Sequence, residues 1–341
     1  MSGRVWSNPP PPWSSPSVLR HNDARAHDLR CPSLRPGLAG GCFTGNIGRA
    51  AGRGTRPPVG PRLAERGPPV TRVLTIANQK GGVGKTTTAV NVAAALALAG
   101  HRVLLVDLDP QGNASTALGI DHASGVPDIY DTLTENTPLV EIVQECPDIA
   151  GLFVAPATVD LAGAEIELVD AEQREHRLKS AIEAYLVEQD KQGNEVDYVL
   201  IDCPPSLGLL TLNGLVAARE VLLPIQCEYY ALEGLSQLLR TVDMVAAHLN
   251  PDLHVSAIVL TMYDGRTRLA SQVAYEVRTH FGARVLDTVV PRSVRVSEAP
   301  SHGLTVIGYD PTSSGAIAYR EVAEQLDAIG APTPTAEETH G

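Results

Sequence analysis

The chain has 341 residues, enough for one large domain or two, with a formal net charge of −12 and five cysteines. This acidic balance excludes a surface that is basic all round, so any contact with nucleic acid must come from a local patch or from a tail. The cysteines form no C-x-x-C pair, which excludes the usual zinc and iron–sulfur spacings. A reduced cytoplasmic protein is the simplest interpretation.

Residues 1–70 differ in composition from the rest. They hold twelve prolines, ten glycines and ten arginines against three acids, a formal charge of +7, so the remainder carries −19. Such a segment cannot bury enough surface to offset its ordering entropy, and we expect it to be disordered. Two interpretations stay open: a regulatory arm that binds DNA weakly, or the product of a wrongly assigned upstream start codon. The sequence contains neither an apolar signal-peptide core nor a bilayer-spanning run.

An apolar run at 73–77 leads into a glycine-rich loop at 79–87 and then into a small-residue segment at 89–100 that has the character of a helix. A phosphate chain needs converging backbone N–H groups, the N-terminus of a helix and a cation. Lys85 supplies the charge for the outer phosphates, and Thr86 can offer its hydroxyl to Mg²⁺. The bare backbone comes from Gly81, Gly82 and Gly84. The order of elements predicts a nucleotide site, with a simple glycine turn as the alternative.

The loop departs from the ordinary phosphate-loop pattern G-x-x-x-x-G-K-[ST]. Gln79 stands where the first glycine is expected, and a second lysine, Lys80, follows it. From the start of the loop, Lys80 cannot easily reach the phosphates that Lys85 contacts. We therefore expect Lys80 to serve a neighbouring subunit.

Two acids follow the next apolar strand, which is expected at 102–107. Asp107 and Asp109 are two residues apart, so they share a face in an extended stretch. They stand at the edge where parallel α/β sheets bind ligands. Near a Mg²⁺–triphosphate, one carboxylate can hold the water shell of the metal and the other can orient an attacking water. The alternative is a solvated turn before Pro110.

A further acid ends the strand expected at 197–202, a continuous apolar run typical of a buried parallel strand. Downstream of a phosphate loop, Asp202 is the expected second Mg²⁺ anchor, with a helix cap or a turn as the alternative. We interpret Cys203 as a packed small residue, because nothing nearby would activate it.

Elsewhere, strands and helices alternate. Helices are expected at 114–118, 129–133, 139–144, 161–184, 231–248, 270–281 and 316–329, strands at 152–155, 220–225, 255–262 and 284–290, and a loop at 291–303. Alternation of this kind predicts an α/β domain over 71–330 with three layers, α/β/α, around a mostly parallel twisted sheet. A polar tail at 331–341 is expected to be disordered. Tyr229 and Tyr230 are interpreted as packing residues rather than a stacking platform.

Arginines follow two of the expected strands. Arg266 comes after the strand at 255–262, whereas Arg292 and Arg295 follow the strand at 284–290. If these loops share one face, an acidic protein gains a basic patch that meets phosphates without reading bases. The alternative is that each arginine is separately solvated.

These stretches resemble a known family. The chain resembles the ParA/Soj-type chromosome and plasmid partition ATPases in their three nucleotide motifs, which would lie here at 80–87, 106–113 and 201–206. The wider deviant Walker A superfamily shares those motifs. Similarity that points to the partition branch continues at 161–168, 226–234 and 291–301. The resemblance covers nearly all of 71–329 and none of 1–70.

The resemblance implies roles for residues around the nucleotide. Lys80 would reach across an ATP-sandwich dimer, Lys85 would hold the β- and γ-phosphates of its own subunit, and Asp109 would position the hydrolytic water. Mg²⁺ would be held directly by Thr86 and through water by Asp107 and Asp202. The cradle for ATP would comprise Lys80, Gly81, Gly82, Val83, Gly84, Lys85, Thr86 and Thr87, with Pro291 and Arg292 bordering the base.

The resemblance also implies partners. Arg266 and Arg295 match positions that family members use for DNA binding without sequence specificity. It implies an ATP-dependent homodimer that coats the nucleoid in the cytoplasm, and a ParB-like centromere-binding protein that stimulates its slow, Mg²⁺-dependent ATPase.

Two alternative functions lack their sequence features. A Min-type division regulator would need a membrane-binding amphipathic helix at its end, and an iron–sulfur carrier would need paired cysteines; the sequence has neither. A non-catalytic, nucleotide-gated DNA-binding scaffold stays open.

Overall fold

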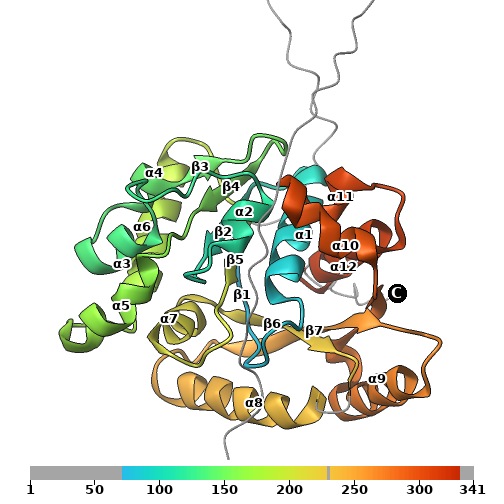
Figure 1. Ribbon diagram of the computed structural model, residues 1–341. Helices are drawn as coiled ribbons and strands as arrows, with labels where there is room; N and C mark the ends of the chain where they lie inside the picture. Colours follow the sequence, from blue (N-terminus) through green and yellow to red (C-terminus); the bar gives the residue numbers. More distant parts are fainter. Residues whose placement is uncertain (1–70, 229–230, 331–341) are drawn as a thin grey trace, which may run out of the picture. The chain divides into compact units, whose positions relative to one another are not determined.

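A computed structural model describes residues 71–228 and 231–330 (Figure 1). Residues 1–70, 229–230 and 331–341 lie outside the described residues. The predictions of disorder at both ends, and of a packing role for Tyr229 and Tyr230, therefore fall outside them as well.

The described residues form one sheet of eight strands in the order β3-β4-β2-β5-β1-β6-β7-β8. Neighbouring strands run parallel throughout, except that β3 pairs antiparallel with β4. The strands are β1 (Arg72–Ile76), β2 (Val103–Asp107), β3 (Gln144–Glu145), β4 (Leu152–Ala155), β5 (Tyr198–Asp202), β6 (Glu220–Gln226), β7 (His254–Tyr263) and β8 (Val285–Pro291). The prediction of a mostly parallel sheet is confirmed.

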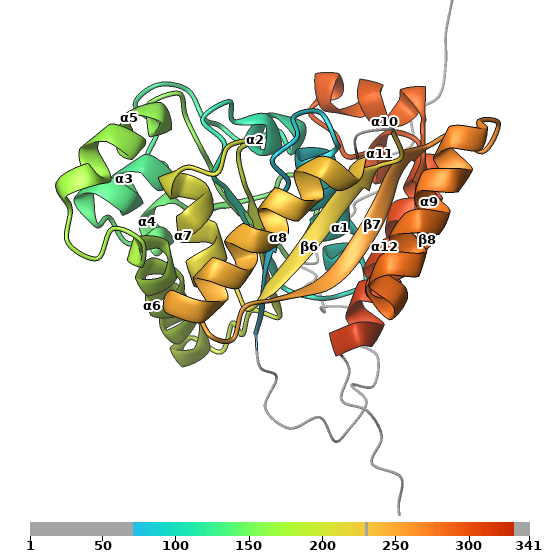
Figure 2. The same ribbon diagram turned by 90° about the horizontal axis from the view of Figure 1, so that it is seen from below.

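Helices connect the strands and cover both faces of the sheet (Figures 1 and 2). They are α1 (Lys85–Leu98), α2 (Asn113–Ala117), α3 (Ile129–Glu135), α4 (Leu139–Ile142), α5 (Leu161–Glu167), α6 (Arg177–Lys191), α7 (Leu209–Ala217), α8 (Ala231–His248), α9 (Arg268–Phe281), α10 (Val294–Glu298), α11 (Val306–Tyr309) and α12 (Ser314–Gly330). Three short 3-10 turns complete the set: η1 (Leu168–Asp170), η2 (Gly282–Arg284) and η3 (Ala299–His302).

Two apolar cores lie on opposite faces of the sheet, because successive side chains of a strand point to opposite sides. In β5, Val199 and Ile201 belong to the core that α3 to α9 share. Tyr198 and Leu200 belong to the other core, which includes α1, α2, α11 and α12. The three-layer α/β/α architecture is therefore as predicted. Parallel strands bring all their carboxyl ends to one edge, so the loops after β1, β2, β5, β6, β7 and β8 meet there.

The single helix predicted at 161–184 is wrong. The chain leaves the helix after η1, where Ala171 is extended and Gln173 has a left-handed φ of 50°, and α6 begins only at Arg177. Residues 172–176 are all polar, so a helical turn there would bury no apolar surface against the core. Apolar residues at helical spacing stand on both sides of residues 172–176, so the sequence pattern does not indicate the break.

Other boundaries also differ from the expectations. The helix expected at 139–144 ends at Ile142, and Gln144–Glu145 instead pair with β4. The loop expected at 291–303 contains α10 and η3. Helix α7 was not anticipated, because it is apolar nearly all round and lacks the amphipathic period that identifies a surface helix.

Helix α7 packs closely on the strand ends that carry the predicted site. The Thr75 hydroxyl donates to the Gly214 carbonyl at 2.7 Å. A Cβ on Gly214 would lie 2.8 Å from Cys203 Sγ and 3.4 Å from Ile201 Cγ2. Glycine at this helical position therefore permits a close approach between α7 and the end of β5.

We expect Gly214→Ala to lower the free energy of unfolding by about 1–3 kcal/mol, because the added methyl group overpacks this contact. The matched control is Gly163→Ala in α5, where the nearest atom to an added Cβ, Glu167 Oε1, is 3.4 Å away. That change should be neutral or stabilising by up to about 1 kcal/mol through helix propensity. Urea denaturation measures both, and equal stability of the two variants would contradict the packing argument.

Candidate functional site

The loop between β1 and α1 leaves the first turn of the helix open. Gly82 and Gly84 have left-handed φ values of 72° and 87°, and Gly84 is the N-cap of α1 without any side-chain cap. The first turn of this 14-residue helix also carries no acid. Its N–H groups and the positive end of its dipole are therefore available to an anion.

A cavity of about 500 Å³ lies over this helix N-terminus, a volume in the range of ligand sites. Its wall is built by residues from separate parts of the chain. Six of the predicted cradle residues line it together with the predicted catalytic acid: Gly81, Gly82, Gly84, Lys85, Thr86, Thr87 and Asp109. Val83 is buried, and its carbonyl accepts a hydrogen bond from the Thr261 hydroxyl at 2.8 Å. Val83 therefore fixes the loop from behind.

Lys85 is buried at the base of this cavity, with 7% of the residue exposed. Its Nζ donates to the Lys80 carbonyl at 3.4 Å, which folds the side chain back over its own loop. Burial lowers the pKa of Lys85, and the carboxylates of Asp202 and Asp109 oppose this shift. An anion bound in the loop would oppose it further.

Asp107 is fully buried and well satisfied. Its carboxylate accepts hydrogen bonds from the Ser115 N–H and the Ser115 hydroxyl, both at 2.9 Å, and from the Asp109 N–H at 3.2 Å. Burial raises the pKa of Asp107 to about 6 in spite of these bonds. Ser115, in α2, had not been singled out in the sequence, where nothing distinguishes it from other small helical residues. Its role is to tie α2 to the end of β2.

Asp202 is equally buried but has no such partners. Neither of its carboxylate oxygens meets a hydrogen-bond partner among the described residues. Burial and the charges of Asp107 and Asp109 raise its pKa well above the usual range, while the Thr86 hydroxyl and the Lys85 ammonium partly offset the rise. In the register of β2 and β5, Asp202 lies directly beside Asp107.

The unsatisfied carboxylate of Asp202 and the Thr86 hydroxyl near it are groups that bind a hard cation. Carboxylate, hydroxyl and phosphate oxygens are the ligands Mg²⁺ takes in nucleotide sites. Within the described ranges, no group of three or more His, Cys, Asp or Glu side chains could hold a metal by itself. The residues therefore fit a Mg²⁺ ion that arrives with phosphates rather than one held by a protein cage.

Asp109 lines the same cavity as Lys85 and Thr86. Its Oδ1 accepts the Gln111 N–H at 3.0 Å, and its carbonyl accepts the Gly112 N–H at 2.8 Å. Gly112, with a φ of 60°, then starts α2. This tight turn directs the Asp109 carboxylate into the cavity instead of into solvent.

Lys80, Pro291 and Arg292 are not among the residues that line this cavity. Lys80 Nζ lies 3.3 Å from Glu228 Oε2, and Arg292 Nη2 lies 3.7 Å from Glu228 Oε1. Pro291 ends β8. The structure thus brings Lys80 and Arg292 to one carboxylate beside the cavity.

The arginines expected to form a basic patch lie at the same edge of the sheet, because β7 and β8 are neighbours. The side chain of Arg266 is 89% exposed and binds Asp264 through its Nη2 at 2.9 Å. Hydrogen bonds from Arg266 lower the pKa of Asp264 to about 2. Arg295, in α10, contacts Glu298 at 3.1 Å and Asp310 at 3.5 Å. Each arginine thus has an acidic partner with which a polyanion would compete.

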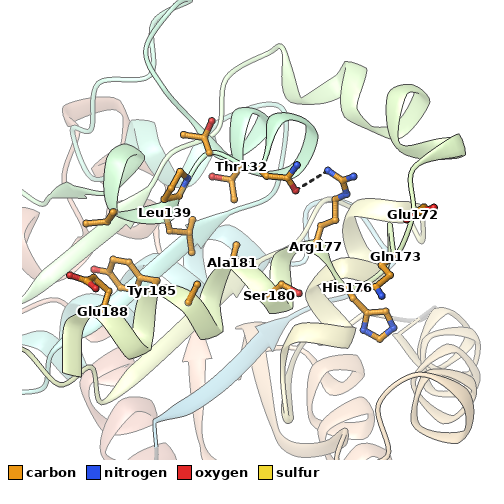
Figure 3. A pocket seen from close by; sticks show the side chains of 15 residues that line it. Thr132, Leu139, Glu172, Gln173, His176, Arg177, Ser180, Ala181, Tyr185 and Glu188 are labelled. Carbon is orange, nitrogen blue, oxygen red and sulfur yellow. Dashed lines mark hydrogen bonds between the residues drawn. The ribbon is translucent and has the colours of Figure 1, made fainter. Parts of the chain in front are cut away.

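A second cavity, of about 550 Å³, lies between the α3–α4 loop and α6 (Figure 3). Arg177 spans one end of it, donating to Asn136 Oδ1 at 3.2 Å and to the Leu133 carbonyl at 3.0 Å. None of the predicted site residues lines this cavity. The arginine holds the end of α3 against α6, and the cavity is separate from the phosphate loop.

Within residues 71–228 and 231–330, every helix is too short or too polar to cross a bilayer.

Known proteins resemble this chain over about three quarters of its length. A family model described as an AAA domain matches residues 71–255. Sporulation initiation inhibitor protein Soj of Bacillus subtilis (strain 168) is 54% identical over 259 residues, covering 76% of this chain and 99% of that protein. Chromosome partitioning protein ParA of Caulobacter vibrioides (strain NA1000 / CB15N) is 51% identical over 255 residues, covering 75% of this chain and 93% of that protein.

Solved structures include a similar chain with a ligand in place. Cobyrinic acid a,c-diamide synthase from Mycobacterium smegmatis, with bound ATP analog and magnesium, is 41% identical and superposes with a TM-score of 0.64. The match covers 75% of this chain and 94% of that chain. The fold is therefore shared with a protein whose structure contains an ATP analog and magnesium.

We expect Asp202→Asn to raise the free energy of unfolding of the nucleotide-free protein by about 1–3 kcal/mol, because it removes an unpaired buried acid. The same change should reduce the rise in melting temperature that ATP and Mg²⁺ produce. Asp107→Asn is the matched control: an amide NH₂ cannot accept from Ser115, so stability should fall by about 1–3 kcal/mol. Thermal denaturation with ATP, Mg²⁺ or EDTA measures both, and a less stable Asp202→Asn protein would contradict the argument.

Proposed function

The chain belongs to the ParA/Soj family of chromosome-partitioning ATPases, and we propose that it works as an ATP-dependent dimer that binds DNA and is reset by hydrolysis. The observation that carries the proposal is the group of Lys85, Thr86 and Asp109 around one cavity, next to the unsatisfied Asp202. That arrangement provides for a triphosphate, for its metal and for an attacking water.

Each residue has a distinct part in the proposed reaction. Lys85 and the N–H groups of the loop bind the β- and γ-phosphates. Thr86 would hold Mg²⁺ directly, and Asp107 and Asp202 would hold its water shell; the ion supplies charge stabilisation for phosphoryl transfer. Asp109 orients the water that attacks the γ-phosphate. Burial of Lys85 and Asp109 at the cavity wall keeps these charges effective.

The proposed switch depends on a second subunit. Lys80 lies outside the cavity of its own subunit, and in a sandwich dimer it would contact the nucleotide of the partner. Pro291 and Arg292 would border the base. Only the γ-phosphate and the metal distinguish the paired from the separate state, so hydrolysis returns the protein to separate subunits.

Pairing would also create the surface for DNA. Arg266 and Arg295 follow neighbouring strands, and two copies would double the cations available to one duplex. Contacts of this kind neutralise phosphates without reading bases. The dimer would then coat the nucleoid in the cytoplasm, where a ParB-like centromere-binding protein would stimulate its slow ATPase and release it locally.

Two other functions are less well supported. A Min-type division regulator fits the fold, but the relatives at 51–54% identity named above are Soj and ParA proteins. A non-catalytic DNA-binding scaffold does not account for a carboxylate at position 109 in the cavity wall. Absence of any ATP turnover would support the scaffold.

We expect wild-type protein to bind non-specific duplex DNA with ATP but not with ADP or without nucleotide. Lys80→Ala should abolish the effect of ATP. Arg295→Ala should weaken binding about tenfold and reduce its salt dependence by about two phosphate contacts, one from each subunit of the dimer. Arg177→Ala, at the separate cavity, is the control and should bind as wild type. Titrations by fluorescence anisotropy at several salt concentrations test this; equal binding in all nucleotide states would contradict the switch.

We expect Asp109→Ala to remain bound to DNA after ATP is added, because the attacking water is no longer oriented while ATP and the metal still bind. Its ATP turnover should fall at least about 100-fold, the usual scale for a group that handles the attacking nucleophile. Phosphate release and DNA dissociation after dilution measure the two effects. Normal turnover in this variant would remove Asp109 from the reaction.

A further inference from the structure

Glu228, two residues after β6, is contacted by three polar side chains. Gln226 Nε2 donates to its Oε1 at 2.5 Å, Lys80 Nζ lies 3.3 Å from Oε2, and Arg292 Nη2 lies 3.7 Å from Oε1. One carboxylate thus holds two cations from the loops after β1 and β8. It belongs to neither the phosphate cradle nor the set of metal-binding residues.

The backbone of Lys80 is fixed by the same strand. Its N–H donates to Asn78 Oδ1 at 3.0 Å, and the buried Asn78 side chain donates to the Pro224 carbonyl in β6 at 2.8 Å. Strand β6 therefore positions the main chain of Lys80 through Pro224 and its ammonium through Glu228. In a single subunit, Lys80 has a defined place over its own chain.

The strength of this contact suits a reversible function. The side chains of Lys80 and Glu228 are 37% and 46% exposed. Ion pairs with such exposure change an equilibrium constant by a factor of about 1.4 to 5. An ion pair of this strength biases the position of Lys80. It is also weak enough for a phosphate group, which carries a higher charge, to replace the carboxylate as the partner of the lysine.

We propose that Glu228 is a positioning residue for Lys80: it retains the lysine within the single subunit, and pairing of two subunits must break this contact. The inference rests on the proposed function, in which Lys80 reaches the nucleotide of the partner. A homodimer has two such contacts, so Glu228 raises the ATP concentration or protein concentration needed for pairing.

Glu228→Gln tests the proposal, because the amide keeps the size of the side chain and removes its charge. The dissociation constant of the ATP-bound dimer should fall about two- to twenty-five-fold, because the factor for a single contact applies once in each subunit. Glu188→Gln is the matched control, since Glu188 pairs with Lys191 at 4.0 Å and its side chain is also 46% exposed. It should pair as wild type. Sedimentation velocity across a protein dilution series measures pairing, and unchanged or weaker pairing of Glu228→Gln would overturn the proposal.

A second measurement examines the contact without nucleotide. Competitive acetylation by acetic anhydride, quantified by mass spectrometry, reports the accessibility of Lys80. Acetylation of Lys80 should increase about two- to fivefold in Glu228→Gln and stay unchanged in Glu188→Gln. Equal acetylation in all three proteins would overturn the proposal.

Lys80→Ala separates the inference from the proposed function. If Lys80→Ala prevents ATP-dependent pairing while Glu228→Gln leaves it unchanged, the sandwich dimer stands and the role of Glu228 is overturned. If Lys80→Ala pairs as wild type, or wild type does not pair with ATP, the sandwich dimer itself fails and the role of Glu228 in pairing fails with it.

Discussion

The burial of Asp202 beside Asp107 is the constraint on which the site depends. The two carboxylates are adjacent in the register of β2 and β5, both fully buried, with the Lys85 ammonium close enough to favour ionisation of Asp202. Two like charges in a low-dielectric interior repel and are poorly solvated. Asp107 is stabilised by hydrogen bonds from Ser115 and Asp109, whereas neither carboxylate oxygen of Asp202 has a hydrogen-bond partner among the described residues.

That asymmetry divides the two acids by function. Asp107 is hydrogen-bonded to α2 and to the turn that carries Asp109, so it also fixes the geometry of the site. Asp202 contributes an acceptor that the described residues do not satisfy, and this makes a cation the natural complement. The close packing of α7, through Gly214 against Cys203, holds the strand end in position while its acid stays unpaired. Stability is thus lower in the nucleotide-free protein than the packing alone would permit.

The sequence was sufficient for the sheet, for the three layers and for the clustering of Lys85, Thr86 and Asp109, because long apolar strands and a glycine loop specify where parallel strands end. It was insufficient at 161–184, where helical spacing on both sides masked the polar break. It was also insufficient for α7, whose apolar surface has no period. Ser115 contacts Asp107 across 8 positions of the sequence, and Glu228 contacts Lys80 across 148. Such contacts depend on the three-dimensional packing of the chain, which a local sequence pattern does not indicate.

The two lysines of the loop differ in a way that would suit the separate roles proposed for them. Lys85 is buried and hydrogen-bonded to its own loop, so any movement would expose the backbone it covers and leave Asp202 without its nearby cation. Lys80 is partly exposed and held by a single carboxylate, so its displacement removes one weak contact and no buried group loses a partner. A lysine that must stay within its subunit is best buried, whereas one that must leave is best held at the surface. Lys80 and Lys85, five positions apart, would therefore combine a releasable contact with a fixed phosphate contact.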